Sequence, residues 1–151
     1  MQYGFARCLA IAALLCPLPA LADAPSPSPA GKWKTFDDAS GNAKSVVTIW
    51  EANGTLAGKV EKVLDASRDE PNPKCSRCEG DLKDQPIIGL RILRDLKKDG
   101  DRWSGGTVLD PSNGQFYSCT ISLEDGGSTL KLRGYIGFSL LGRTQRWSRV
   151  P

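Results

Sequence analysis

Short runs in which apolar and polar residues alternate, each ended by a turn signal, follow one another from Gly31 to the end of the chain. An alternation with a period of two places one face of a strand against a core and the other face in water. This region contains no long run with the apolar spacing of a helix. The sequence therefore predicts a single all-β domain over residues 31–151.

Two turn signals predict hairpins most clearly. Asn53-Gly54 follows a run rich in β-branched residues and precedes a second alternating run, and Asn-Gly favours the positive φ of a tight hairpin turn. Residues 125–127, with the sequence Asp-Gly-Gly, separate two later runs in the same way. Gly105-Gly106 lies inside another run and predicts a bulge or a sharp bend there.

Eight alternating runs are present, joined mostly by short turns. They span residues 32–37, 44–51, 55–64, 88–96, 102–109, 115–123, 129–137 and 143–149. Eight antiparallel strands close into an up-and-down barrel, which leaves no free edge. A β-sandwich of two sheets has the same number of strands and is the alternative. The run 88–96 also fits a helical spacing, but a strand lets residues 98–100 turn into the next run.

Residues 65–86 form the one long connection, with three prolines, six acidic and four basic side chains among 22 residues. Compact domains seldom leave so long a segment without regular structure. Such a segment is usually a lid, a binding loop or a disordered excursion. We expect it to lie over an entrance to the barrel.

The first 22 residues have the pattern of a secretory signal peptide: a cationic start with Arg7, an apolar run at residues 8–15, and small residues before a cut ahead of Asp23. The apolar run of about 8 residues is too short to span a bilayer, which needs roughly 20. Acylation of Cys16, as in a lipoprotein, is disfavoured because the preceding Leu15 is bulky.

The predicted mature chain begins with a proline-rich segment. In residues 23–30 prolines alternate with small residues, which predicts an extended and exposed tether. No later segment approaches the roughly 18 consecutive apolar residues of a membrane-spanning helix. We therefore expect a soluble periplasmic or secreted protein without a transmembrane segment.

Several motifs, taken in order, resemble an uncharacterised family of secreted bacterial proteins called domain of unknown function 2147. They are Gly31-Lys32-Trp33, residues 75–81, Gly105-Gly106, Asp110-Pro111, Asn113-Gly114, residues 133–135 and residues 142–149. The resemblance covers nearly all of the predicted domain. It implies a small exported β-barrel similar to lipocalins, and it implies no established activity.

The early Gly-x-Trp motif and an arginine on the last strand also resemble the lipocalin arrangement in which a tryptophan plugs one end of the barrel. The resemblance implies that Trp33 is the plug and that Arg149 or Arg146 lies across its ring, as cation–π stacking allows. The spacing does not choose between the two arginines. The alternative is that Trp33 is an ordinary core residue and the arginines are solvated.

The predicted mature chain holds three cysteines. Cys75 and Cys78 are three residues apart, which favours a small-ring disulfide in an oxidising compartment over a metal site, since a second cysteine pair and any histidine are lacking. Redox catalysis is disfavoured because acidic residues surround the pair. Cys119 lies on the apolar face of its run and is expected to be a buried free thiol, and a bridge from it to Cys75 or Cys78 is the alternative.

Charge is distributed unevenly along the chain, whose formal net charge is +3. Residues 126–151 hold five basic side chains and no acidic one, so they are candidates to receive an anionic head group or an envelope polymer. The alternative is that these side chains form the wet face of two strands. Nucleic acid is not expected as a partner of an exported protein with so modest a charge.

An eight-stranded barrel has room for one small ligand, so aromatic and basic residues on its strands are candidates to contact a lipophilic or anionic molecule. The candidate ligand-binding residues are Trp50, Trp103, Tyr117, Arg133, Tyr135 and Arg143. Ordinary core packing is the competing explanation for the aromatic residues. The sequence alone does not say which face of each strand points inward.

The chain has no histidine, which excludes Ser-His-acid and Cys-His nucleophiles. A carboxylate-dependent hydrolase would have to use acids such as Asp37, Asp38, Glu51 and Asp110, all of which also have structural explanations. We therefore rank a ligand-binding module first, an envelope interaction module second and an enzyme last. No cofactor or metal is expected, and the oligomeric state is left open.

Overall fold

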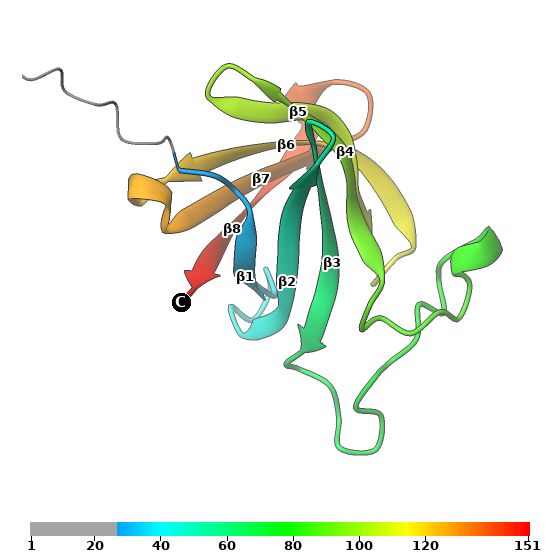
Figure 1. The fold of residues 1–151 in the computed structure, drawn as a ribbon. Coiled ribbons are helices and arrows are strands. Elements are labelled where there is room, and N and C mark those ends of the chain that lie inside the picture. Colours follow the sequence, from blue (N-terminus) through cyan, green and yellow to red (C-terminus); the bar gives the residue numbers. More distant parts are fainter. Residues whose placement is uncertain (1–26) are drawn as a thin grey trace, which may run out of the picture.

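The computed structural model describes residues 27–151, so the predicted signal peptide and the first part of the predicted tether lie outside the described residues. Eight antiparallel strands in sequence order form one closed barrel (Figure 1). The strands are β1 Gly31–Phe36, β2 Ala43–Ala52, β3 Thr55–Val63, β4 Arg91–Asp99, β5 Arg102–Asp110, β6 Gln115–Glu124, β7 Thr129–Tyr135 and β8 Gly142–Val150. The predicted barrel is confirmed and the alternative β-sandwich is wrong.

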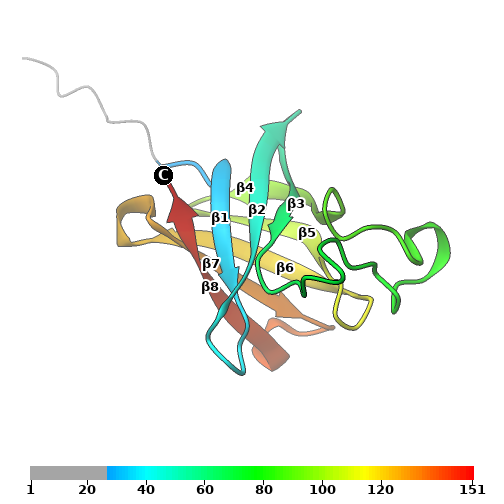
Figure 2. The ribbon, with the colours of Figure 1, turned by 90° about the horizontal axis from the view of Figure 1, so that it is seen from below.

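Three short 3₁₀ helices lie in the connections, and no helix within residues 27–151 is long and apolar enough to cross a membrane. The 3₁₀ helices are η1 Gly80–Leu82, η2 Asp125–Gly127 and η3 Ser139–Leu141. Figure 2 shows the sheet turning through the whole barrel until β8 lies beside β1. The first and last strands therefore close the structure against each other.

The fourth strand differs most from its prediction. It was expected at residues 88–96 and is found three residues later, as Arg91–Asp99. The Leu90 N–H donates to the Ile87 carbonyl at 3.0 Å, which closes a turn where the strand was expected to begin. At its other end the strand continues until Asp99 pairs with Arg102. The predicted bulge is confirmed, since the β5–β6 register shifts between Trp103 and Gly106.

The two ends of the barrel differ in their connections. The connections at residues 37–42, 64–90, 111–114 and 136–141 lie at one end, which we call the open end. The tight turns and the two termini of the described chain lie at the other, which we call the closed end. Large, fully buried side chains fill the interior towards the closed end, among them Trp33, Leu56, Leu96, Ile121 and Leu130.

Trp33 plugs the closed end. It lies on β1 directly opposite Arg149 of β8, and the guanidinium carbon of Arg149 is 4.2 Å from the centroid of its ring. The indole N–H donates to the Pro29 carbonyl at 2.8 Å. The structure therefore places Arg149 over the plug. Arg146 lies away from it and binds the Glu124 carboxylate at 2.9 Å.

Arg149 also binds the chain on both sides of the plug. Its guanidinium donates to the carbonyls of Ser28, Ala30 and Gly127, at distances of 2.8, 3.0 and 2.7 Å. Pro29 is fully buried. Residues 27 and 28 are exposed, as the predicted tether requires, but the segment is not free of the barrel. Pro29 and the half-buried Ala30 pack against the plug, because their carbonyl groups accept hydrogen bonds from Trp33 and Arg149.

Gly31 explains the Gly-x-Trp motif. Residues other than glycine rarely adopt its φ of +132°. A Cβ at this position would also lie 2.8 Å from a guanidinium nitrogen of Arg149. The glycine therefore lets the chain turn into β1 while Arg149 approaches the backbone. Trp33, two residues later, then faces the interior.

We predict that Trp33→Ala lowers the free energy of unfolding by about 3 to 5 kcal/mol, the usual cost of deleting a large buried aromatic ring. Arg149→Ala should be coupled to it in a double-mutant cycle, because the two side chains are in contact. Chemical denaturation of the four proteins measures the coupling. Arg146→Ala is the matched control, and equal coupling of both arginines to Trp33 would contradict the assignment.

Candidate functional site

A cavity of about 1040 Å³ occupies the open half of the barrel. Its wall is apolar below the rim, where it is formed by Val60, Val63, Ile87, Ile92, Val108, Leu109, Leu132 and Trp147. In an eight-stranded barrel the interior is just wide enough for side chains to fill. Gly134 and three valines are among the inward-facing residues at this end, whereas fully buried large side chains such as Trp33, Leu56 and Leu96 fill the closed end. The small side chains leave the space.

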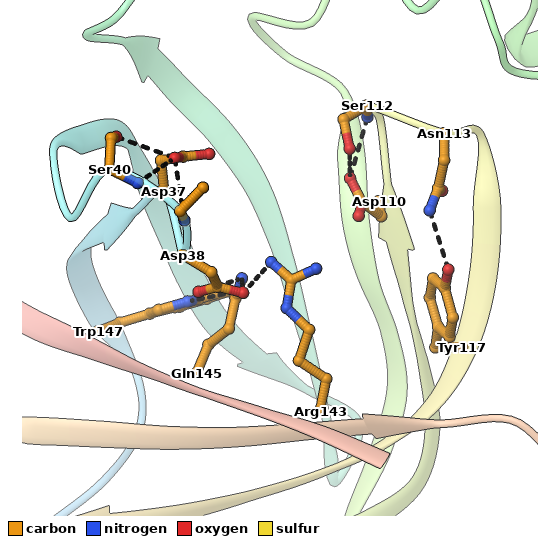
Figure 3. A network of polar contacts seen from close by, with 11 residues as sticks. Asp37, Asp38, Ser40, Asp110, Ser112, Asn113, Tyr117, Arg143, Gln145 and Trp147 are labelled. Atoms are coloured by element: carbon orange, nitrogen blue, oxygen red, sulfur yellow. Dashed lines mark hydrogen bonds and ion pairs between the residues drawn. The ribbon is translucent and has the colours of Figure 1, made fainter. Parts of the chain in front are cut away.

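A polar network crosses the mouth of the cavity and connects the β1–β2 loop to β8 (Figure 3). The carboxylate of Asp38 forms an ion pair with Arg143 and accepts hydrogen bonds from the Gln145 amide at 3.1 and 3.2 Å. The Gln145 carbonyl in turn accepts the indole N–H of Trp147 at 3.2 Å. The network therefore orients an aromatic ring that forms part of the cavity wall.

Two further acidic side chains at the mouth, Asp37 and Asp110, accept hydrogen bonds from residues nearby in sequence. Asp37 accepts the backbone N–H of Ser40 at 2.8 Å, and this bond is the main reason that its pKa lies below the usual value. Asp110 accepts the backbone N–H and the hydroxyl of Ser112 at 3.0 and 2.6 Å. The nearby Asn113 amide donates to the Tyr117 hydroxyl at 2.9 Å. These bonds fix the loops around the opening (Figure 3).

The cavity mouth carries more acidic than basic side chains. Its carboxylates are Asp37, Asp38, Asp65, Glu70 and Asp110, and its basic groups are Lys44 and Arg143. Arg143 is already paired with one of the carboxylates. The side chains that line the opening therefore carry a net negative formal charge.

Of the five basic residues of the last two strands, only Arg143 lines the mouth, where it is paired with Asp38. Lys131 and Arg146 both bind Glu124, and the hydrogen bond from Arg146 is the main reason that the pKa of this carboxyl lies below its usual value. Arg149 lies over the plug at the closed end. The idea that residues 126–151 offer a basic site for an anionic group is therefore not supported by their positions.

Of the six residues predicted to contact a ligand, Tyr117, Tyr135 and Arg143 lie in the cavity wall. Trp50 does not. The buried Val47 and Ile49 point into the barrel, so Trp50, the next residue along β2 after Ile49, points to the outside. This position corrects the prediction for Trp50. Its face could be assigned only with the strand register in hand.

Trp103 and Arg133 also lie outside the cavity. Trp103 is buried in the core at the start of β5, about 17 Å along the strand from Val108 in the cavity wall. Arg133 points away from the interior, since its guanidinium donates to the Thr144 hydroxyl and to the Leu140 carbonyl at 3.1 and 3.2 Å. These two positions correct the prediction as well.

Trp147, Gln145 and Asp38 form part of the cavity wall but were not among the predicted ligand-binding residues. A signal for Trp147 was present, because Arg143, Gln145, Trp147 and Arg149 alternate along one strand and so share a face. If Arg149 is placed at the plug, Trp147 must also point inward. No local pattern indicated Asp38, whose partners lie more than a hundred residues away in sequence.

The long connection between β3 and β4 forms one side of the mouth. Asp65, Glu70 and Pro73 line the cavity, which agrees with its expected place beside an entrance. Its centre is held by the Cys75–Cys78 disulfide, which confirms the predicted pairing, and both cysteines are buried.

The disulfide segment packs against the β5–β6 turn. A Cβ on Gly114 would lie 1.9 Å from the Arg77 carbonyl oxygen, so only glycine allows this approach. The Sγ of Cys75 lies 3.5 Å from the Pro111 carbonyl oxygen in the same turn. The connection is therefore fastened to the barrel at its middle, while its first residues border the opening.

The closed eight-stranded barrel and its one-ended cavity define a small lipocalin-like protein. Residues 31–149 match the family of uncharacterised proteins conserved in bacteria, DUF2147, and the chain belongs to this family.

Among solved structures, the chain is similar to protein HP1028 from the human pathogen Helicobacter pylori, which is described as belonging to the lipocalin family. The two chains share 21% identity with a TM-score of 0.71, over 83% of this chain and 84% of that one, so the likeness concerns the fold. A comparison with curated proteins gives no match.

We predict that Cys119 does not react with iodoacetamide in the folded protein. Burial raises the pKa of its thiol to about 12, so the reactive thiolate is scarce at neutral pH. Peptide mapping without reductant should find Cys75 linked to Cys78, and Cys119 alkylated only after unfolding. Rapid modification of Cys119 in the native state, or a bridge from it to the loop, would overturn this assignment.

Proposed function

We propose that the protein binds a small apolar or amphipathic molecule in the open half of the barrel. The observation that carries this proposal is the cavity of about 1040 Å³, which has an apolar wall and opens at one end of a barrel whose other end is filled by the core and Trp33. Ligand pockets are typically about 300 to 1,000 Å³ in volume and mostly apolar, with few polar groups that fix orientation. The space is thus sufficient for one lipid-like molecule.

The charges at the mouth favour a neutral or cationic polar end over an anionic one. Five carboxylates and two basic groups border the opening, so an anionic head group would meet net repulsion there. The ion pair between Asp38 and Arg143 leaves Lys44 as the other basic group of the rim. This reverses the polarity that the charge of the last two strands suggested.

We propose binding rather than catalysis as the function of the cavity. A glycosidase-type hydrolase needs one carboxylic acid whose pKa is raised, so that it can donate a proton. The pKa of Asp37 is instead lowered by its hydrogen bonds to Ser40, and Asp38 is ion-paired. The carboxylate of Asp110 accepts the backbone N–H of Ser112 and so stabilises the turn there. Structural tasks therefore account for the acids nearest the strands.

We further propose that the chain is exported to the periplasm or outside the cell. The signal-peptide pattern of the first 22 residues and the disulfide between Cys75 and Cys78 support this, since structural disulfides persist in oxidising compartments. We predict that the intact mass of the protein recovered from a bacterial host corresponds to a chain beginning at Asp23. An unprocessed chain, or a lipid-modified Cys16 at the terminus, would contradict this prediction.

We predict that Gly134→Phe abolishes ligand binding without unfolding the barrel. Gly134 lines the cavity and has no positive φ, and an added Cβ would make ordinary contacts with Tyr117 and Val108, at 3.5 and 3.7 Å. A phenyl ring there should fill the cavity and lower affinity by at least about tenfold. Trp fluorescence during titration with a long-chain alcohol, amine and carboxylate of equal length measures binding.

The matched control is Ser118→Phe, which adds the same ring to the exposed outer face of neighbouring β6. It should bind as the unmodified protein does, with the amine and alcohol preferred to the carboxylate because of the acidic mouth. Trp147→Phe identifies the reporter, since Trp147 is the tryptophan in the cavity wall. Absence of binding by all three ligands, together with no co-purifying molecule in native mass spectrometry, would refute the proposed function.

A further inference from the structure

The connection between β7 and β8 exposes four large apolar side chains within six residues. Ile136 is 66% exposed, Phe138 78%, Leu140 88% and Leu141 81%. The other exposed large apolar residues of the described chain have exposed fractions of only 36 to 42%. Single exposed apolar residues are ordinary on a protein surface, but a group of this kind marks an interaction site. We call residues 136–141 the apolar loop.

The apolar loop is continuous with the cavity. Ile136 and Leu141 line the mouth, whereas Phe138 and Leu140 are not part of the cavity wall. The same stretch of chain thus offers apolar surface to the inside of the barrel and to its surroundings. A molecule leaving the cavity past this loop would stay in contact with apolar groups.

Three backbone groups of the apolar loop have hydrogen-bond partners within the protein. The N–H of Leu141 donates to the Phe138 carbonyl at 3.1 Å, and the Leu140 carbonyl accepts a bond from Arg133 at 3.2 Å. Backbone polar groups that enter an apolar medium without a partner carry a large energetic cost. These bonds lower the energetic cost of moving the tip of the loop into an apolar medium.

We propose that the apolar loop inserts into the interface of a lipid bilayer and docks the open end of the barrel on the membrane, so that the ligand passes between bilayer and cavity. The part of this statement that concerns the ligand rests on the proposed function. A stable protein interface buries about 1,200 to 2,000 Å² across a matched surface, which one six-residue loop does not supply. Insertion into a bilayer needs apolar side chains on a projecting segment and no matching surface.

The charges around the mouth indicate which bilayer the loop fits. Carboxylates outnumber basic groups there, so anionic lipids would repel this end of the barrel. Attachment should therefore depend on apolar insertion into zwitterionic lipid and should persist at high salt, which screens charge interactions.

The test is co-sedimentation of the full mature protein with phosphatidylcholine vesicles. The double variant Phe138→Ser, Leu140→Ser should lower the vesicle partition coefficient by at least about tenfold, since it removes two large apolar side chains. Trp50→Ser is the matched control, because Trp50 is a large, half-buried apolar residue on the outer face of β2 beside the turn at the closed end, far from the loop. It should bind vesicles as the unmodified protein does.

A second measurement locates the loop. Leu140→Cys provides a labelling site for an environment-sensitive fluorophore, because the native Cys119 is buried and the other two cysteines of the described chain are bridged. Vesicles should shift the emission of the fluorophore to shorter wavelength, and lipids carrying a quencher in the acyl chain should quench it. An unshifted emission would overturn the proposal.

Three further results would also overturn the proposal: no vesicle binding by the unmodified protein, equal binding by the loop variant, or binding that high salt abolishes. Concentration-dependent self-association that the loop variant removes, without vesicle binding, would assign the loop to a contact between copies instead. A failure of the proposed function alone would give another result. The protein would then still bind vesicles through Phe138 and Leu140, while no ligand would bind in the cavity of any variant.

Discussion

The contact between Arg149 and Trp33 holds together the part of the barrel where closure is weakest. β1 and β8 are the first and last strands, so their pairing must join segments more than a hundred residues apart, and its register covers only Lys32 to Lys34. Arg149 strengthens this short pairing by stacking on the buried ring and by binding three carbonyl groups around it. With that end sealed, the hydrophobic core lies between the plug and the middle of the barrel. The opposite half is free to remain open.

The open half shows how the same architecture can carry a cavity. Small inward-facing side chains and Gly134 leave space near the strand ends, and polar bonds at the rim connect the surrounding loops to the strands. Asp38 is central here, since it joins the β1–β2 loop to Arg143 and Gln145 on β8. The disulfide segment fastens the long connection to the β5–β6 turn. The packed core therefore lies towards the closed end and the cavity at the other.

The placement of charge separates this site from a simple anion-binding pocket. Lys131 and Arg146 bind Glu124, and Arg149 stacks on Trp33. Carboxylates outnumber basic groups at the mouth. The apolar loop lies beside these carboxylates and supplies the large exposed apolar group at this end. Both features agree in chemistry with the proposed partners, a neutral or cationic amphiphile and a zwitterionic membrane surface.

The sequence by itself determined the number of strands, the approximate bounds of all but the fourth, the bulge at Gly105-Gly106 and the disulfide, because alternation, glycine and cysteine spacing act over a few residues. Tertiary structure alone chose Arg149 over Arg146 and turned Trp50 and Arg133 outward. It also brought Asp38 to Arg143. These outcomes depend on strand register and on closure of the barrel, where a shift of one residue exchanges the inner and outer faces of a strand. Local patterns predict strands, but the pairing of distant strands decides which side chains meet.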